Sequence, residues 1–210
     1  MSVIAKRIPN KPINSNSFVV YTEANNFCVI IDPGTEDCAD LIAFINQKKL
    51  IPEYIILTHE HFDHIWGVNK LKEIFNCKLL CSKDCSARIT SRKKNMSFFY
   101  NQVGFETYPA DIHIEDIDYQ IFWNQKVIEF ISTKGHSDGS ICILIENNLF
   151  CGDTIINNCK TVIKLPGGSK SKLINSLSLL EKKFSGKQIR IHSGHGESFW
   201  YEDVKNIKLL

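Results

Sequence analysis

The chain has 210 residues, 43% of them hydrophobic, which is enough apolar material for one sizeable domain or two small ones. The formal net charge of +2 at pH 7 gives no general attraction to nucleic acid or to an anionic membrane. The sequence has no apolar run near the ~18 residues that span a bilayer, and its first residues lack the hydrophobic segment of a signal peptide. We therefore expect a single cytoplasmic domain over residues 1–210, with no nucleic-acid and no membrane partner.

Apolar periodicity in the first half of the chain predicts alternating strands and helices. Strands are expected over residues 17–21, 28–31, 54–57 and 78–81. Helices are expected over residues 36–48 and 67–75, and Pro52 is expected to close the connection after the first of them. Residues 83–110 are less regular and predict a helical excursion, in which the basic run 88–94 is interpreted as a solvated helix face. The alternative is that this run attracts an anionic thiol or acyl substrate. Phe98, Phe99 and Tyr100, which follow it, are interpreted as packing residues rather than as a binding cage.

The second half of the chain is mostly strand, interrupted by one amphipathic helix over residues 171–183. Its strands are expected over residues 119–122, 127–132, 141–145, 149–151 and 188–192. Asn147-Asn148 is a hairpin-turn signal between two of these strands. Because strands and helices come in two sequential batches, a layered sheet core with helices outside is favoured.

Eight cysteines are scattered along the chain, several of them inside apolar runs where Cys acts as a small hydrophobic residue. Reduced thiols are therefore favoured over disulfides. Cys77, Cys81 and Cys85 are regularly spaced, which we interpret as one strand running into a helix. A separate zinc site there would need a fourth ligand.

Four strong metal ligands lie within six residues, directly after the apolar run 54–57. They are His59, His61, Asp63 and His64. Imidazole and carboxylate together suit zinc and other first-row transition metals. On a tight turn, His59 and His61 can reach one ion, whereas the adjacent Asp63 and His64 diverge and can reach a second point nearby.

Three further candidates have small or turn-forming neighbours and lie at or near the ends of apolar runs: His136, Asp153 and His195. Such strand-to-loop junctions are where ligands of a shared site belong. The alternative is a polar loop of hydrogen-bonded histidines that binds no metal. The three further candidates, at similar strand-to-loop positions, make this alternative unfavourable. His113 and His192 are interpreted as ordinary surface or core histidines.

The order HxHxDH, then His, Asp and His, resembles the metallo-β-lactamase superfamily of hydrolases. Within it, the chain most resembles the single-domain, glyoxalase II-like (hydroxyacylglutathione hydrolase-like) group. The signatures that carry this resemblance are Asp32-Pro33-Gly34, Thr58-His59-x-His61-x-Asp63-His64, Gly135-His136-x-x-Gly139-Ser140 and Gly152-Asp153-Thr154. The resemblance implies an α+β fold, the four-layer αββα sandwich known as the metallo-β-lactamase fold.

The resemblance also implies two divalent metal ions, zinc first, with iron or manganese as alternatives. The first ion would be bound by His59, His61 and His136. The second would be bound by Asp63, His64 and His195, with Asp153 bridging the two. Asp32 would orient a ligand imidazole through its other ring nitrogen.

The activity that the resemblance implies is hydrolysis of a small thioester, ester or lactone by a bridging hydroxide, with Asp63 and Asp153 as the catalytic carboxylates. Full glyoxalase II enzymes carry a C-terminal helical domain that helps to hold glutathione, and we expect this domain to be absent here, because only 15 residues follow His195. Two other functions remain open: a mononuclear iron persulfide dioxygenase and, less favoured by the balanced charge, a nuclease.

Overall fold

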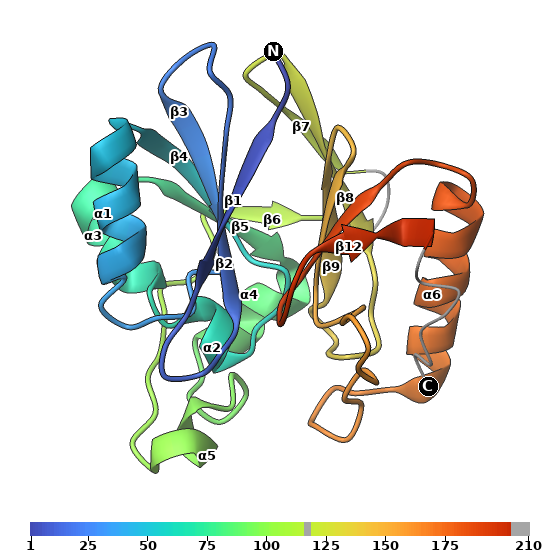
Figure 1. Cartoon of the computed structure of the whole chain (residues 1–210). Coiled ribbons are helices and arrows are strands. Elements are labelled where there is room, and N and C mark those ends of the chain that lie inside the picture. Colours follow the sequence, from blue (N-terminus) through green and yellow to red (C-terminus); the bar gives the residue numbers. More distant parts are fainter. Residues whose placement is uncertain (116–118, 203–210) are drawn as a thin grey trace. The chain divides into compact units, whose positions relative to one another are not determined.

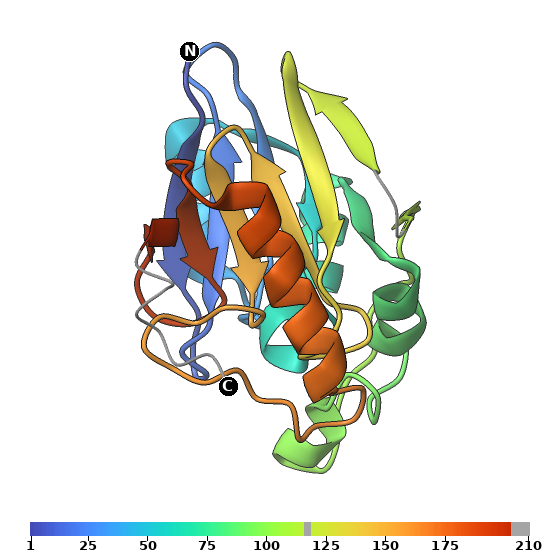
Figure 2. The ribbon, with the colours of Figure 1, turned by 90° about the vertical axis from the view of Figure 1, so that its right-hand side faces the viewer.

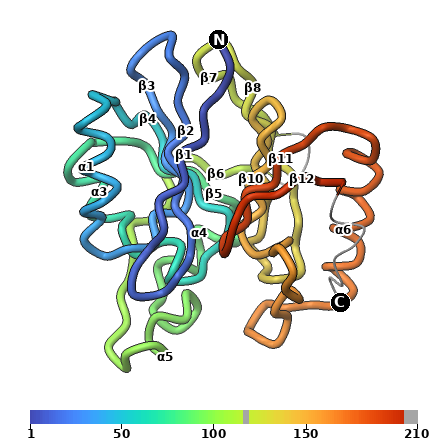
Figure 3. Tube along the Cα trace, in the orientation of Figure 1, coloured from blue at the N-terminus to red at the C-terminus, as the bar shows by residue number. Residues whose placement is uncertain are grey.

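The computed structural model describes residues 1–115 and 119–202. The chain forms two compact units, Met1–Ile114 (unit 1) and Glu115–Leu210 (unit 2). Among the described residues, each unit is built on one six-stranded sheet. The path of the chain through the strands and helices can be followed in Figures 1 and 3. The single domain expected over residues 1–210 stays a prediction.

Unit 1 carries a mixed sheet whose strand order follows the chain. Strands β1 to β3 pair antiparallel and β3 to β6 pair parallel. The strands are β1 (Ile4–Pro9), β2 (Asn16–Tyr21), β3 (Phe27–Ile31), β4 (Ile51–Ile56), β5 (Lys78–Ser82) and β6 (Ile112–Ile114). The helices are α1 (Ala39–Lys48), α2 (Phe62–Ile65), α3 (Val68–Phe75), α4 (Lys83–Ile89) and α5 (Ser97–Asn101).

One hydrophobic cluster joins the helices of unit 1 to one face of its sheet. Leu41 and Ile45 of α1 and Leu71 of α3 pack with alternate strand residues such as Ile30 and Ile55. Each such side chain contributes about 1.5–3 kcal/mol on full burial. In β3 and β5 the neighbouring strand residues are also buried, so these two strands are nearly continuous apolar runs, as parallel strands usually are.

Unit 2 carries a sheet with the order β12-β11-β10-β9-β8-β7. All its neighbours pair antiparallel except β10 and β11, which are parallel and are connected through α6 (Lys170–Phe184). Leu180 and Phe184 of α6 pack on one face of this sheet, which the helix covers in Figure 2. The strands are β7 (Gln120–Trp123), β8 (Lys126–Ser132), β9 (Ile141–Ile145), β10 (Asn148–Gly152), β11 (Arg190–Ser193) and β12 (Phe199–Trp200).

The structure differs from the sequence-based expectation in several details: β1 and β12 were not predicted, and β4 begins at Ile51 rather than at Tyr54. Helix α1 begins only at Ala39, because Cys38 is left-handed with φ 51° and the chain cannot be helical before it. Pro52 lies inside β4, opposite Cys28, where a register shift marks an irregular pairing that tolerates a missing N–H. The β9–β10 turn is Glu146-Asn147 rather than Asn147-Asn148, since Asn148 already pairs with Ile145.

The cysteine interpretation agrees with the structure. Cys77 precedes β5, Cys81 lies in β5 and Cys85 lies in α4, so the regular spacing follows a strand into a helix. All eight cysteines are free thiols, and only Cys159 is exposed. Among the described residues, no helix is long and apolar enough to cross a membrane.

Candidate metal centre

The first group of ligands lies where two neighbouring parallel strands of unit 1 end. Asp32 directly follows β3, and the segment from Thr58 to His64 follows β4. Parallel neighbours present their carboxyl ends at the same edge of a sheet, which is where open α/β sheets bind ligands. The sheet topology therefore brings Asp32 beside a ligand segment that lies 26 to 32 residues away in the chain.

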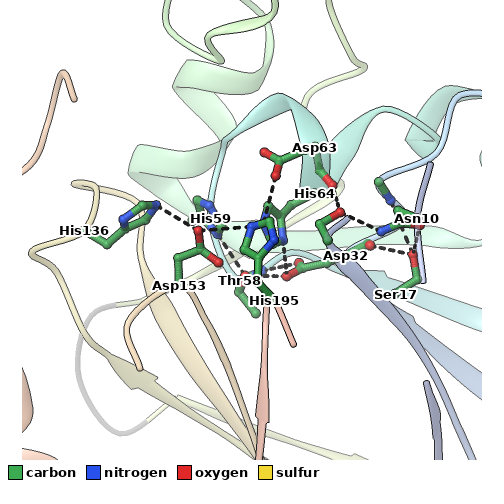
Figure 4. A network of polar contacts seen from close by, with 12 residues as sticks. Asn10, Ser17, Asp32, Thr58, His59, Asp63, His64, His136, Asp153 and His195 are labelled. Atoms are coloured by element: carbon green, nitrogen blue, oxygen red, sulfur yellow. Dashed lines mark hydrogen bonds and ion pairs between the residues drawn. The ribbon is translucent and has the colours of Figure 1, made fainter. Parts of the chain in front are cut away.

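The Asp32 carboxylate determines the orientation of the His64 imidazole. Its Oδ1 atom accepts from the Thr58 backbone N–H at 2.8 Å, and Oδ2 lies 2.5 Å from Thr58 Oγ1 and 3.0 Å from His64 Nδ1 (Figure 4). A carboxylate only accepts, so both the hydroxyl and Nδ1 donate to it. With its proton on Nδ1, neutral His64 presents a lone pair on Nε2, the arrangement that metal-binding histidines require.

The same chain of hydrogen bonds extends to His59. Its Nδ1 atom lies 3.0 Å from Thr58 Oγ1, whose proton is already directed to Asp32. The hydroxyl oxygen therefore accepts from His59 Nδ1–H, and the Nε2 lone pair of this ring is also presented. The role expected for Asp32, orientation of a ligand imidazole, is what these contacts describe, and Thr58 passes it on to a second imidazole.

His61 and Asp63 complete this group. The rings of His59 and His61 meet edge to face with centroids 4.8 Å apart, and Asp63 Oδ2 lies 3.6 Å from His64 Nε2. All four ligand residues are buried. Burial strengthens electrostatic attraction to a cation, because little water is present to screen it.

The backbone beneath this group is fixed by close packing. The Asp63 carbonyl accepts from Ser15 Oγ at 2.5 Å, and a Cβ on Gly34 would lie only 1.7 Å from the same carbonyl oxygen. The Asn10 side-chain amide hydrogen-bonds with the hydroxyls of Ser15 and Ser17. Asp32 itself is left-handed with φ 50°, a strained conformation for a residue with a side chain. The ligand segment is therefore held in one backbone conformation.

The second group lies in unit 2 and uses the same device. Asp153 follows β10 and His195 follows β11, its parallel neighbour, while His136 lies in the loop between β8 and β9. Asp153 Oδ2 is 3.5 Å from His195 Nε2 and 3.7 Å from His136 Nε2 (Figure 4). Two imidazoles thus converge on one carboxylate oxygen.

His136 is oriented by the backbone. Its Nδ1 atom is 2.8 Å from the Val162 carbonyl oxygen, which can only accept, so neutral His136 also presents its lone pair on Nε2. Helix α6 holds the loop: Ser176 Oγ donates to the Lys134 carbonyl at 2.7 Å, and Lys172 pairs with Asp138 at 2.8 Å. A Cβ on Gly135 would lie 2.4 Å from the backbone of Leu173 on α6.

The donor chemistry of both groups fits divalent metal ions. Five imidazoles and two carboxylates are the ligand types that zinc, iron and manganese accept. The seven predicted ligands fall into these groups, four in unit 1 and three in unit 2.

His113 and His192 lie outside them: His113 Nε2 contacts Ser86 Oγ at 3.2 Å, and His192 contacts Ser198 and Asn148 at 2.8 and 3.0 Å. Burial and the nearby Arg190 lower the pKa of His192 to about 4.

Sequence reasoning missed several supporting residues. Thr58 was only part of a signature, and nothing in the sequence identifies the Val162 carbonyl as a partner of His136. Arg88, expected on a solvated face, instead places Nε 3.5 Å from the buried Glu60 carboxylate in the ligand segment. A signal for this pair was present, because a charged residue between two buried ligands requires a partner.

A model of the Metallo-beta-lactamase superfamily matches residues 10–189 of the chain. The chain is 30% identical over 190 residues to a probable metallo-hydrolase of Methanocaldococcus jannaschii, with 88% of each sequence covered. It is 32% identical over 150 residues to a hydroxyacylglutathione hydrolase of Francisella philomiragia, covering 70% of this chain and 50% of that protein. The chain thus spans about half the length of this relative.

Among solved structures, the chain is similar to the BLEG-1 B3 metallo-beta-lactamase, with a TM-score of 0.88 and 27% identity. The likeness covers 97% of each chain. The α+β class and the metallo-β-lactamase fold expected from the sequence are confirmed by this likeness and by the two mixed sheets with their helices. From the family match, the relatives and the His/Asp groups, the chain belongs to the metallo-beta-lactamase superfamily.

Proposed function

We propose that the chain is a metal-dependent hydrolase of a small thioester, ester or lactone. The observation that carries this proposal is the set of hydrogen bonds to the Nδ1 atoms of His59, His64 and His136. Each bond leaves an Nε2 lone pair for a cation. The same orientation occurs in the ligand loops of both units, as expected for residues whose Nε2 atoms bind metal.

We further propose that the two groups act together on two ions. His59, His61 and His136 would bind the first ion. Asp63, His64 and His195 would bind the second, with Asp153 shared by both. Zinc is the first choice of metal, and iron or manganese are alternatives that the same ligands accept.

Two such ions, when bound, supply hydroxide near neutral pH and polarise a substrate carbonyl. Asp63 would orient the attacking oxygen by accepting its hydrogen bond, and Asp153 would determine the spacing of the ions. Addition of water to the carbonyl carbon and cleavage of its C–S or C–O bond then give a carboxylic acid and a thiol or alcohol. The buried ligand segment would limit access of bulk water to the reacting atoms.

The thioester preference is supported by relatives that are hydroxyacylglutathione hydrolases. The probable metallo-hydrolases of similar length support only the broader activity.

The test combines elemental analysis of the purified protein with hydrolysis of S-D-lactoylglutathione, simple aryl esters and lactones, with a chromogenic cephalosporin as comparison. Two metal equivalents and turnover of a thioester, ester or lactone, both lost in Asp63→Asn and Asp153→Asn, are expected. A single iron equivalent with oxygen consumption and no hydrolysis would replace the proposal with an oxygenase. Cephalosporin turnover alone would replace it with a β-lactamase.

A further inference from the structure

The helix α2, which carries Asp63 and His64, is contacted by residues 91–108. This segment contains α5 and is here called the α5 arm. Phe62 of α2 stacks on Tyr100 of the arm, with ring centroids 4.8 Å apart and planes inclined by 27°. The Phe62 backbone N–H donates to the Asn95 carbonyl at 2.9 Å. Since Phe62 lies between His61 and Asp63 in the chain, the arm directly contacts the ligand segment.

The arm is held in place by ring contacts with Trp66 and by hydrogen bonds from Asn95. Trp66, at the end of α2, stacks on Phe105 at 5.4 Å and meets Tyr100 edge to face at 5.6 Å. The buried Asn95 side chain donates to the carbonyls of Ile89 and Phe105 at 3.2 and 2.8 Å. These contacts give the arm a defined inner face, so its outer side chains occupy defined positions as well.

Several large apolar side chains of the arm are exposed to solvent. Phe99 is 63% exposed, Tyr100 42%, Val103 67% and Tyr108 49%. Four large exposed apolar side chains within ten residues exceed the isolated examples that ordinary surfaces carry, and such clusters usually mark binding surfaces. Tyr100 belongs to both faces, because its ring stacks on Phe62 and is partly open to solvent.

The arm is also locally basic. Arg92, Lys93 and Lys94 are all exposed. Arg92 is engaged inside the arm by Glu106 and by the Val103 carbonyl, and Lys93 Nζ lies 5.8 Å from the centre of the Phe98 ring. Lys93 therefore places positive charge beside the half-buried Phe98 ring, and Lys94 adds a second exposed charge next to it in the chain, although the whole chain carries only +2.

The topology of the unit 1 sheet places the arm at the edge of the sheet where the unit 1 ligands lie. The arm follows β5 and α4, and β5 is the parallel neighbour of β4, so the connection leaves the sheet at the edge where the unit 1 ligands lie. Figures 1 and 2 both show α5 beyond α2 at that end of the unit 1 sheet.

We propose that the α5 arm recognises the acyl part of the substrate, and that it selects acyl chains combining an apolar segment with an anionic group. This inference rests on the proposed hydrolase function. The apolar segment would lie along Phe99, Tyr100 and Val103, and the anion would meet Lys93 and Lys94. Each methylene group fully buried there strengthens binding by up to about fourfold, so binding should increase with the length of the acyl chain.

The first test measures binding without turnover, using 8-anilinonaphthalene-1-sulfonate, whose aromatic body and sulfonate have the proposed chemistry. The double variant Phe99→Ser/Val103→Ser should weaken fluorescence-detected binding to the metal-loaded protein by at least about fivefold. Lys93→Gln/Lys94→Gln should weaken it severalfold and reduce its salt dependence. Phe122→Ser is the matched control, because Phe122 is 79% exposed on β7 of unit 2. Equal weakening by the control, or none by the arm variants, would overturn the proposal.

The second test compares kcat/KM for acyl thioesters whose chains end in a carboxylate and lengthen by one methylene group at a time. The wild-type protein should prefer longer chains, and Phe99→Ser/Val103→Ser should flatten that dependence while Phe122→Ser keeps it. If hydrolysis occurs and Phe99→Ser/Val103→Ser keeps the same chain-length dependence as Phe122→Ser, the recognition surface is refuted but the hydrolase function is not. Absence of hydrolysis with arm-dependent probe binding refutes the proposed function and leaves the surface in place.

Discussion

The two ligand groups orient their imidazoles by different means. In unit 1, a single carboxylate, Asp32, directs His64 directly and His59 through the Thr58 hydroxyl. In unit 2, His136 is directed by a backbone carbonyl, that of Val162. An orientation set by a side chain can be removed by one substitution, whereas an orientation set by the backbone depends on the path of the loop. Unit 1 should therefore be the more sensitive of the two to point mutation.

The largest expected effect breaks the backbone under the unit 1 ligands. Gly34→Ala puts a Cβ 1.7 Å from the Asp63 carbonyl oxygen, so one of two packed main-chain segments must move. We expect the free energy of unfolding to fall by about 3 kcal/mol or more, measured by urea denaturation. Gly186→Ala in unit 2 is the control: its Cβ meets nothing within 4 Å, so only the left-handed strain of about 1–2 kcal/mol applies. Equal losses would contradict the close packing at Gly34.

The second prediction concerns His192 on β11, the strand that leads to His195. Its pKa is lowered from 6.5 to about 4 in the folded chain by burial and by Arg190, so the unfolded chain binds the proton first. Stability that is complete above pH 6.5 is therefore lost as the pH falls toward 4, by about 3 kcal/mol. Urea denaturation at pH 7 and pH 4 should show a pH dependence smaller by this amount in His192→Asn. Identical dependence in both proteins would contradict a neutral buried His192.

The third prediction sharpens the contrast between the groups through Asp32→Asn. Asparagine tolerates the left-handed backbone of residue 32, but its amide directs N–H groups toward Thr58 and His64. His64 would then carry its proton on Nε2. Metal affinity measured by competition with a chelator should fall by about 10- to 100-fold. Asp37→Asn, in the exposed turn before α1, should leave the affinity at the wild-type value; a matching loss there would remove the role given to Asp32.

The smallest predicted effect compares the two acceptors themselves. Thr58→Val removes the hydroxyl between Asp32 and His59 and should weaken metal binding by about 2- to 12-fold, the worth of one hydrogen bond. Thr58→Ser should restore it. Val162→Ala should change nothing, because His136 donates to the main-chain carbonyl and the Val162 side chain is 49% exposed. A loss in Val162→Ala equal to that in Thr58→Val would abolish the distinction between the groups.

Much of this organisation could be predicted from the sequence because it is written in local patterns. The ligand segment 58–64 is contiguous and follows an apolar strand, and the helices α3 and α6 follow apolar periodicity. The turn was predicted at Asn147-Asn148 but lies one residue earlier, at Glu146-Asn147. Two adjacent asparagines indicate a turn without giving the register of the strands. The inclusion of Pro52 in β4 depends on an irregular pairing with β3 that no local pattern encodes.

The supporting contacts of the site could be predicted only in part. Asp32 was identified through a family signature, but its contact with His64 spans 32 residues and arises from the parallel pairing of β3 and β4. The partner of His136 is a main-chain atom, which every residue possesses, so no residue type marks it. The Glu60–Arg88 ion pair joins the ligand segment to α4 and likewise depends on tertiary structure.

The buried thiols are unreactive toward alkylating reagents in the folded chain, so their alkylation reports local unfolding. Burial raises the pKa of Cys28 and Cys38 to about 12 and that of Cys77 to about 11, so almost none of the nucleophilic thiolate exists at neutral pH. In the native state an alkylating reagent meets only Cys159. Labelling of the other seven thiols requires their segments to open, so mass spectrometry of partly labelled protein would rank the local stability of α1, β3 and β5 without any engineered probe.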